Sequence, residues 1–308
     1  MILTILKTPF RDNSIPLFDL HCDTFTKIYK NSTDFNDNSL HISSSKIRGF
    51  CPYTQVAAIW SDKRFNDEDA YRQYVECLSF VKNLKFYENN APSQRFILAI
   101  EDARLLNGDI TRLQRTYSDG VRVITLCWKD VSCIGGGWNT SAPLTEFGVS
   151  VVKECIRLGI IIDLSHSSLP VQEEAFAICK KYGTSPIFSH SNSYSVHPHL
   201  RNISDTTFLN TVRLGGVVGI SLCPEHLGMN AGICDVMHHI DKFLSLGGQN
   251  NICLGCDFDG IDATPKGLYD IQCLTKLYSL IIDNYGKTVA DSIFYFNAFN
   301  FFNKHERR

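Results

Sequence analysis

Short apolar runs separated by longer amphipathic stretches recur along the whole chain. The runs are of the β-prone kind, and eight of them are centred near Phe18, Ala57, Leu98, Ile124, Ile162, Ile187, Val218 and Leu254. Between most of them, apolar residues recur three and four apart, which is the spacing of a helix with one buried face. These stretches predict helices over residues 67–87, 146–158, 170–182, 205–214, 235–246 and 274–285.

The alternation of strands with helices predicts an α/β fold with a parallel sheet, and eight strands indicate a closed (β/α)8 barrel of the TIM type. The rival is an open doubly wound sheet, but no G-x-G-x-x-G motif follows an early strand. No linker-like tract or repeat divides the 308 residues, so we expect a single domain with its core at about 15–303. Residues 132–143, after the fourth strand, are either a mobile loop over the barrel mouth or a plain connector.

The charge balance argues against a polyanionic partner. Thirty basic and 32 acidic residues leave a net charge of -2, so neither nucleic acid nor an anionic membrane is expected as the main partner, and a small ligand fits better. Residues 1–13 have no signal-peptide pattern, and no apolar stretch is long enough to span a bilayer. These observations predict a cytoplasmic protein.

The 12 cysteines are scattered singly, often inside apolar runs, as expected of reduced core residues. The one C-x-x-C motif joins Cys253 and Cys256. A three-residue spacing on a strand sends these two thiols to opposite faces, so we do not expect a redox or zinc clip there.

Side chains with metal-ligand chemistry stand at the predicted carboxyl ends of five of the eight strands. The first strand runs into DLHCD, in which alternation puts Asp19, His21 and Asp23 on one face. The other strand ends carry Glu101, His166, His190, Asp257 and Asp259. Because the carboxyl ends of barrel strands form the rim that holds active sites, we expect these side chains to meet there.

Three imidazoles and two carboxylates have the makeup of a two-metal site, in which one carboxylate bridges cations about 3.5–4 Å apart. Glu101 is the natural bridge, and the predicted ligands are His21, Asp23, Glu101, His166 and His190. The remaining histidines fall in predicted loops or helices and are interpreted as surface or packing residues: His41, His197, His199, His226, His238, His239 and His305.

Several motifs stand in the order seen in the renal (membrane) dipeptidases. They are residues 19–24 (DLHCDT), 99–101 (AIE), 163–168 (DLSHSS), 188–191 (FSHS), 200–202 (LRN) and 255–260 (GCDFDG). The resemblance runs from about residue 19 to 302 and includes a closing helix with Asn297-Ala298-Phe299. The most specific part is His190-Ser191 followed eleven residues after His190 by Arg201-Asn202, and then D-F-D-G.

This resemblance implies a zinc-dependent dipeptidase with an amidohydrolase-like barrel. It implies two zinc ions per chain, one held by His21, Asp23 and Glu101 and the other by Glu101, His166 and His190. A hydroxide that bridges the ions would attack the peptide carbonyl of a free dipeptide, with tolerance of a C-terminal D-residue as a further expectation.

The resemblance also assigns the groups that handle the substrate. Asp257 would take the proton of the attacking water, pass it to the leaving amine and receive the substrate's ammonium group, and Arg201 would clamp the terminal carboxylate. Asp259 is expected to cap the following loop or to support the site from behind. A homodimer is implied as well.

One position departs from the family pattern. Animal members carry a His just after the fourth strand that is thought to contact the oxyanion, and Trp128 stands there in this chain. We expect Trp128 to form a wall of the substrate pocket, with a slower reaction or a different substrate as the other outcome.

Two other functions are compatible with the sequence. Related barrels bridge their metals with a carboxylated Lys after the fourth strand, and Lys129 lies close to that place, so a binuclear amidohydrolase acting on a non-peptide amide or an N-acyl amino acid is the first alternative. A non-catalytic binding protein that kept the barrel is the second. Burial of so many ionisable groups without a metal would be costly, which makes the second the weaker of the two.

Overall fold

Seven parallel strands form one curled sheet with the order β5-β4-β3-β2-β1-β7-β6. The structure, a computed structural model, describes residues 14–84 and 94–306. The strands are β1 (Ile15–Cys22), β2 (Phe50–Trp60), β3 (Gln94–Glu101), β4 (Val121–Thr125), β5 (Ile161–Asp163), β6 (Val218–Ile220) and β7 (Ile252–Leu254).

The predicted strand near Ile187 closes this sheet into a barrel, although it makes only isolated bridges. On one side Ile187 bridges Asp163 of β5, and the Ile187 N–H donates to Ile162 O at 2.9 Å. On the other side Phe188 bridges Val218 of β6. The eight apolar runs therefore surround one axis, which confirms the TIM-like barrel expected from the sequence.

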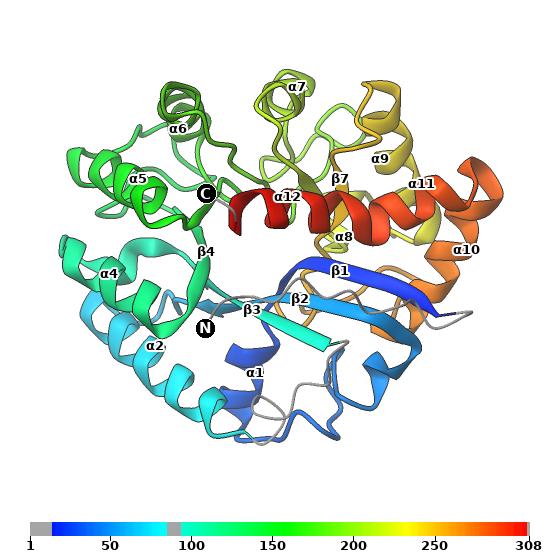
Figure 1. Cartoon of the computed structure of the whole chain (residues 1–308), viewed down its shortest axis with the longest axis horizontal. Coiled ribbons are helices and arrows are strands. Elements are labelled where there is room, and N and C mark those ends of the chain that lie inside the picture. The colour runs from blue at the N-terminus through cyan, green and yellow to red at the C-terminus, as the bar shows by residue number, and fades with distance from the viewer. Residues whose placement is uncertain (1–13, 85–93, 307–308) are drawn as a thin grey trace.

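Helices surround the barrel, and Figure 1 shows them as a ring around the strands. The α-helices are α1 (Thr24–Asn31), α2 (Asp67–Lys82), α4 (Ile110–Asp119), α5 (Glu146–Leu158), α6 (Leu169–Tyr182), α7 (Asp205–Arg213), α8 (Pro224–Leu227), α9 (Ile233–Ser245), α10 (Leu274–Tyr285), α11 (Lys287–Asp291) and α12 (Asn297–Glu306). Short 3₁₀ turns cover Lys46–Gly49, Ala103–Leu106 and Ile271–Cys273, and one π-helical turn covers Ser292–Phe296.

Side-chain caps explain where several predicted helices begin. The hydroxyls of Thr145, Ser168 and Ser204 accept backbone N–H groups in the first turns of α5, α6 and α7, and left-handed glycines end α5 and α6. All six predicted helices are present with ends within about two residues, except that α2 ends at Lys82. Residues 85–87 of that prediction, like the segment 1–13, lie outside the described residues.

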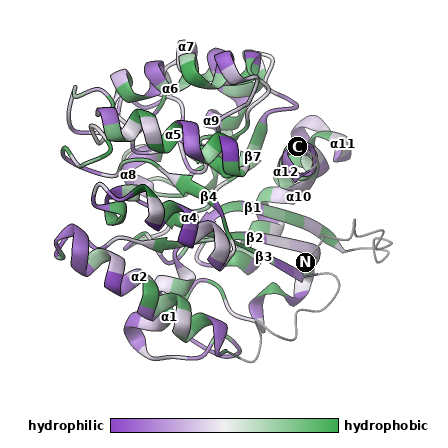
Figure 2. Cartoon of the chain, turned by 60° about the vertical axis from the view of Figure 1, so that its left-hand side comes forward, coloured by the Kyte–Doolittle hydropathy of each residue, from purple (hydrophilic) through white to green (hydrophobic). Residues whose placement is uncertain are grey.

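The apolar residues form two layers. The inner layer fills the barrel and includes Phe18, Leu20, Val56 and Ile97, whereas the outer layer packs the strands against the helices. In Figure 2 β1 and β7 are mostly hydrophobic, and the surrounding helices carry both hydrophobic and hydrophilic positions. Burial of this amount of apolar surface is the main favourable term in folding.

The C-terminal helix closes the amino end of the barrel. α12 lies across the middle of the ring in Figure 1, and Phe302 packs on Phe18 of β1 with ring centroids 4.9 Å apart. We call the buried cluster of Tyr295, Ala298, Phe301 and Phe302 the floor. It leaves the carboxyl ends of the strands as the open rim.

The loop and cysteine predictions can be compared with the fold directly. Residues 132–143 form a hydrogen-bonded loop, in which Gly137 bridges Ser167 and the Ser168 N–H donates to Gly136 O at 2.9 Å. All 12 cysteines are free. Cys253 lies in the inner layer and Cys256 in the outer one, so the prediction that the C-x-x-C thiols face opposite ways is confirmed.

Candidate metal centre

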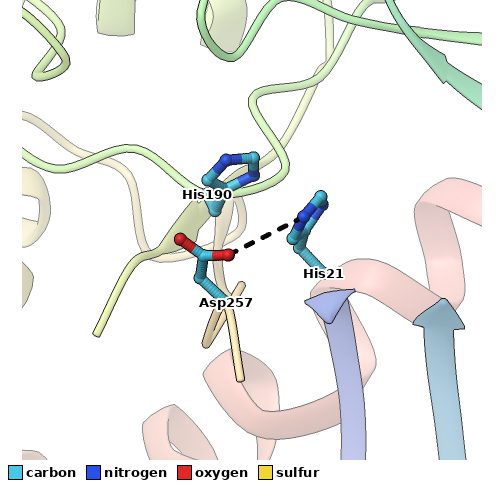
Figure 3. Close-up of side chains that lie close together, drawn as sticks. All are labelled: His21, His190 and Asp257. Carbon is cyan, nitrogen blue, oxygen red and sulfur yellow. Dashed lines mark ion pairs between the residues drawn. The ribbon is translucent and has the colours of Figure 1, made fainter. Parts of the chain in front are cut away.

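The five predicted ligands meet at the rim, together with Asp257. They form three overlapping groups whose donor atoms lie within 4.8 Å of one another: His21, Asp23 and Glu101; Glu101, His166 and His190; and His21, His190 and Asp257. Every member of the first two groups is buried. Figure 3 shows the third group, with His21 and His190 beside the Asp257 carboxylate.

Glu101 stands between the first two groups. Its Oε2 is 3.5 Å from His21 Nε2, and its Oε1 is 3.0 Å from His166 Nε2 and 3.7 Å from His190 Nε2. Each carboxylate oxygen therefore faces a different group. This is the arrangement that a bridging carboxylate requires.

The backbone at two of these positions is unusual. His166 has φ of 65° and Asp257 has φ of 61°, in the left-handed region that non-glycine residues seldom occupy. Both follow strand ends, so the turn after the strand aims each side chain back over the barrel axis. The strain is held in place by the surrounding barrel, as is common where geometry serves a site.

Asp19 does not join the cluster, so the prediction that it shares a face with His21 and Asp23 is wrong. The register of β1 against β2 shifts between Asp19 and Cys22, and simple alternation ends there. The Asp19 carboxylate instead accepts the Cys256 N–H at 2.9 Å and the Gln55 side-chain amide at 3.2 Å. Burial raises the pKa of Asp19 to about 6 despite these hydrogen bonds.

Two of the imidazoles are held neutral. Burial, reinforced by the Arg201 guanidinium, holds the pKa of His166 well below its usual range. Burial and the nearby His21 do the same to the pKa of His190. A neutral imidazole has a free lone pair, which is the form that binds a metal.

At Glu101, Asp257 and His21, the surroundings raise the pKa values and favour the protonated forms. Burial and the neighbouring Asp23 raise the pKa of Glu101, and burial raises the pKa of Asp257 well above its usual range. Burial opposes a charge on His21, but Glu101 and Asp23 outweigh it and raise the pKa of the imidazole. Bound protons thus offset part of the negative charge of the crowded carboxylates.

The donor set fits a cation. His21 Nε2 and Asp23 Oδ1 are buried and have no hydrogen-bond partner among the described residues, which is costly for polar atoms. His166 Nε2 and His190 Nε2 are 2.7 Å apart, so the two imidazoles present these nitrogens to one point. Nitrogen and carboxylate oxygen donors aimed at shared points are the ligands that zinc prefers.

A cavity of about 540 Å³ opens above this cluster. All three tryptophans of the chain line it: Trp60 at the end of β2, Trp128 after β4, and Trp138 in the 132–143 loop. The Trp60 and Trp128 rings meet edge to face with centroids 5.3 Å apart, and Trp128 lies 5.7 Å from the His166 ring. Trp128 is therefore a wall residue of the cavity.

Arg201 lines the same cavity and is buried. Its Nη2 donates to the His190 carbonyl at 3.3 Å, whereas its Nε has no partner among the described residues. Burial lowers the pKa of this guanidinium, with Asp257 and Glu101 opposing the shift. A buried cation with a free N–H beside the cluster is able to bind an anionic group.

The turn after Asp257 packs directly against the cluster. A Cβ on Gly260 would lie 2.3 Å from Asp23 Oδ2 and 2.5 Å from Asp257 Oδ1, so only glycine fits this close approach. Asp259 accepts hydrogen bonds from the Thr24 hydroxyl at 2.6 Å and the His41 N–H at 2.7 Å. Asp259 thus ties the turn to the segments that follow β1.

Several residues that line the cavity were not anticipated there from the sequence, among them Trp60, Trp138, His199 and His226. Trp60 pairs with Glu101 in the β2–β3 register, so the strand-end rule that located Glu101 would also have located Trp60. His199 comes from a loop and His226 from the short helix α8, and their rings approach to 4.8 Å. No spacing signal in the sequence relates them.

A closed α/β barrel with buried His and carboxylate groups at its carboxyl rim defines the class of barrel proteins that hold metal ions above their strands. The family model of the membrane dipeptidases, peptidase family M19, matches residues 12–307. The chain belongs to this family, whose members are metallopeptidases, so a metal cofactor is expected.

Individual relatives agree with this assignment. A protein named dipeptidase aclJ from Aspergillus oryzae is 32% identical over 209 residues, which cover 64% of this chain and 48% of that protein. The chain spans about half the length of the curated relatives it matches.

Solved structures share the fold. The crystal structure described as dipeptidase AC, a metallopeptidase of family M19, superposes with a TM-score of 0.87 at 21% identity and covers 96% of this chain and 100% of that one. A metallopeptidase from Rhodobacter sphaeroides, liganded with a phosphinate mimic of the dipeptide L-Ala-D-Ala, has a TM-score of 0.84 at 20% identity, covering 95% of this chain and 99% of that one.

Across residues 14–84 and 94–306, no helix combines the length and the apolar character needed to cross a bilayer.

Proposed function

We propose that this chain is a metal-dependent dipeptidase that hydrolyses the peptide bond of free dipeptides. The observation that carries the proposal is the position of Glu101, whose two carboxylate oxygens face two separate groups of potential metal ligands. The same cavity offers a buried cation, Arg201, and a buried acid, Asp257. Family membership and the named dipeptidase relatives support the reaction class.

The proposed cofactor is a pair of Zn²⁺ ions bridged by Glu101. One ion would be held by His21 and Asp23 and the other by His166 and His190, which accounts for the unpaired buried atoms of the cluster. When bound, such a pair polarises the scissile carbonyl and lowers the pKa of water enough to give a hydroxide nucleophile near neutral pH.

Asp257 is proposed as the group that moves the proton. Its Oδ1 lies 3.8 Å from His21 Nε2, so the carboxylate borders the point where the ligand groups meet (Figure 3). From there Oδ1 can accept a proton from the attacking water and return it to the leaving amine. The raised pKa of Asp257 favours the first of these transfers, because it makes the carboxylate a stronger base.

Arg201 is proposed to bind the terminal carboxylate of the substrate. Its Nε is buried without a hydrogen-bond partner among the described residues, so a carboxylate in the cavity would give this donor an acceptor. Asp257 would receive the substrate's ammonium group at the other end. Two charged groups that bracket the ligand select a short zwitterion and reject longer peptides.

We also propose that the site tolerates a D-residue at the C-terminal position of the dipeptide. The Rhodobacter sphaeroides neighbour is liganded with a mimic of L-Ala-D-Ala, which supports tolerance of a C-terminal D-residue here. Trp128 is proposed to contact the substrate as a wall, leaving oxyanion stabilisation to the metal pair. The Lys129 alternative is weaker, because the Lys129 ammonium lies over the Trp138 ring at 5.8 Å and Glu101 already occupies the shared position.

Three further expectations remain proposals. Twelve free cysteines suit a reducing compartment, which supports a cytoplasmic location. The homodimer rests on the family resemblance alone, and the single domain on the absence of a linker-like tract. Cell fractionation and sedimentation of the purified chain test the first two.

A direct experiment uses purified protein, reconstituted with Zn²⁺, and a panel of dipeptides with L- and D-residues at the C-terminal position. We expect release of free amino acids, loss of release on chelation, and two metal equivalents per chain. Tripeptides and N-acyl amino acids serve as controls. Turnover of N-acyl amino acids in preference to dipeptides would support the amidohydrolase alternative, and full activity in Glu101→Ala would overturn the site.

A further inference from the structure

A single buried hydroxyl lies behind the metal cluster and touches ligands of both groups. Ser189 Oγ is 2.7 Å from His190 Nδ1 and 3.4 Å from His21 Nδ1. Both rings therefore turn their Nδ1 edge toward Ser189 and their Nε2 edge toward Glu101. Ser189 is 1% exposed and lies outside the lining of the cavity.

The hydroxyl proton of Ser189 already takes part in a hydrogen bond to Asp163. Ser189 Oγ lies 2.6 Å from Asp163 Oδ2, and a carboxylate oxygen can only accept. Asp163 stands at the end of β5, is fully buried, and also accepts hydrogen bonds from the Thr125 hydroxyl at 2.6 Å and from the Ser165 and Ser189 N–H groups at 3.0 and 2.9 Å. This set of donors fixes the carboxylate in one orientation.

The direction of the Ser189–Asp163 bond determines where the proton of His190 resides. Because Ser189 donates its only proton to Asp163, its oxygen can only accept from His190, which places the imidazole proton on Nδ1. Nε2 of the neutral ring then keeps its lone pair and faces Glu101. The remaining lone pair of Ser189 is shared between His21 Nδ1 and the Ser165 hydroxyl, each at 3.4 Å, so its hold on His21 is weaker.

The main chain gives Ser189 little freedom to move. Its N–H is bound by Asp163, and a Cβ on Gly255 would lie only 1.7 Å from the Ser189 carbonyl oxygen. The hydroxyl is thus held by the Asp163 carboxylate, and the main chain that carries it is confined at both its N–H and its carbonyl. Such preorganised partners are what orient metal-binding imidazoles.

We propose that Ser189, oriented by Asp163, is a positioning residue that sets the tautomer of His190 and supports that of His21, so that one hydroxyl prepares a ligand for each of the two proposed metal positions. The inference rests on the proposed function for its metal, but not on the identity of the substrate. It adds two residues that touch neither the metal nor the substrate to the machinery of the site.

The test compares three variants for Zn²⁺ affinity, measured by competition with a chromophoric chelator. Ser189→Ala removes the acceptor for His190 Nδ1–H, and we expect metal affinity to fall by about 10- to 100-fold. Asp163→Asn replaces one carboxylate oxygen with an amide NH₂ group, which would donate to Ser189. Ser189 would then donate to His190, and the ring proton would move to Nε2. We expect metal affinity to fall at least as much as in Ser189→Ala. Ser191→Ala is the matched control, because its hydroxyl is equally buried one residue after His190 and has no partner among the described residues.

A second readout reports the tautomer itself. In metal-free protein with ¹⁵N-labelled histidines, of which the chain has 10, the His190 nitrogen shifts should report protonated Nδ1 in the wild type and protonated Nε2 in Asp163→Asn. Metal affinity in Ser189→Ala within threefold of Ser191→Ala, or an unchanged tautomer in Asp163→Asn, would overturn the inference. If one variant does not fold, as judged by circular dichroism, the other decides the question.

The outcomes separate this inference from the dipeptidase proposal. Wild-type protein that binds metal but cleaves no dipeptide removes the proposed substrate and leaves the role of Ser189 to be judged from metal affinity alone. Dipeptide hydrolysis with unaltered metal affinity in both variants removes the role of Ser189 and leaves the function intact.

Discussion

The two ends of the barrel are built on opposite principles. At the floor, aromatic and aliphatic side chains of the last helix and of the π-helical turn before it pack on the inner layer, with Tyr295 and Phe302 against Phe18 at ring-centroid distances of 6.2 and 4.9 Å. At the rim, buried ionisable groups crowd together, and within residues 14–84 and 94–306 His21 Nε2 and Asp23 Oδ1 find no hydrogen-bond partner. The same β1 strand carries Phe18 toward one end and His21 at the other.

Stability and chemistry therefore reside at opposite ends of the barrel. Apolar burial at the floor stabilises the fold, whereas desolvated charges at the rim cost free energy until a ligand compensates them. Substitutions at the rim should therefore abolish function with little loss of stability in the metal-free protein. Substitutions at the floor should do the reverse.

The largest effect is expected for Glu101→Ala. Because Glu101 contributes an oxygen to each ligand group, its loss should bring dipeptide hydrolysis to background and reduce bound metal below one equivalent. The metal-free variant should unfold at a urea concentration no lower than metal-free wild type, since a buried carboxylate that burial and Asp23 disfavour has been removed. Marked destabilisation of the metal-free variant would mean that the rim also carries the fold.

Asp257→Asn should lower kcat by about 10²- to 10⁴-fold, the usual contribution of a proton-transfer group. The amide oxygen retains the shape of the carboxylate but not its basicity, so metal content should stay near that of wild type. Elemental analysis alongside steady-state kinetics checks this. Equal loss of metal and activity would instead make Asp257 a ligand.

At the floor, Phe302→Ala should lower the free energy of unfolding by about 3–5 kcal/mol, because a fully buried ring leaves a cavity. The kcat of the folded fraction should not change. Asn300→Ala, at an exposed position of the same helix, is the control and should shift stability by under about 0.5 kcal/mol. A change in kcat with Phe302→Ala would show that the two ends are mechanically coupled.

Arg201→Lys should raise KM more than it lowers kcat. Replacement of the planar fork by a point charge should cost about 1.5–3 kcal/mol, or roughly 10- to 150-fold in kcat/KM. Dipeptides amidated at the C-terminus provide the control, since they lack the carboxylate that Arg201 is proposed to bind. Wild type and variant should handle them alike, and an equal penalty on amidated dipeptides would argue against the clamp.

The smallest effect concerns a histidine that supports the rim without facing the cavity. His239 accepts the Ser193 N–H at 3.0 Å and contacts the Leu227 carbonyl at 3.2 Å, and burial lowers its pKa to about 4. The unfolded chain, with a histidine pKa near ~6.5, binds the extra proton first, so stability falls as pH drops from 6.5 toward 4.

Between pH 7 and 5.5, protonation of His239 should lower the free energy of unfolding by about 1 kcal/mol. Urea unfolding of wild type and His239→Gln at both pH values should show a smaller pH difference in the variant. Phe302→Ala should instead lose the same free energy at both pH values. An undiminished pH difference in His239→Gln would place the titration elsewhere.

Much of the fold was predictable because local rules hold along most of the chain. The capping hydroxyls of Thr145, Ser168 and Ser204 fix helix starts within a turn of the expected positions, and the apolar period separates strands from helices. Local rules failed at Asp19, where a register shift in β1 breaks the alternation. They also missed the weakness of the strand at Ile187, which makes only isolated bridges.

The sequence by itself determined the barrel and the chemistry of its strand ends, because side-chain periodicity and the common direction of parallel strands are properties of the local chain. Only the tertiary structure decided which donors face each other across Glu101, that His199 and His226 reach the cavity, and that Ser189 lies behind both His21 and His190. Those relations join residues as distant as His21 and Ser189, which are 168 positions apart, so they depend on closure of the ring and leave no pattern in any one segment.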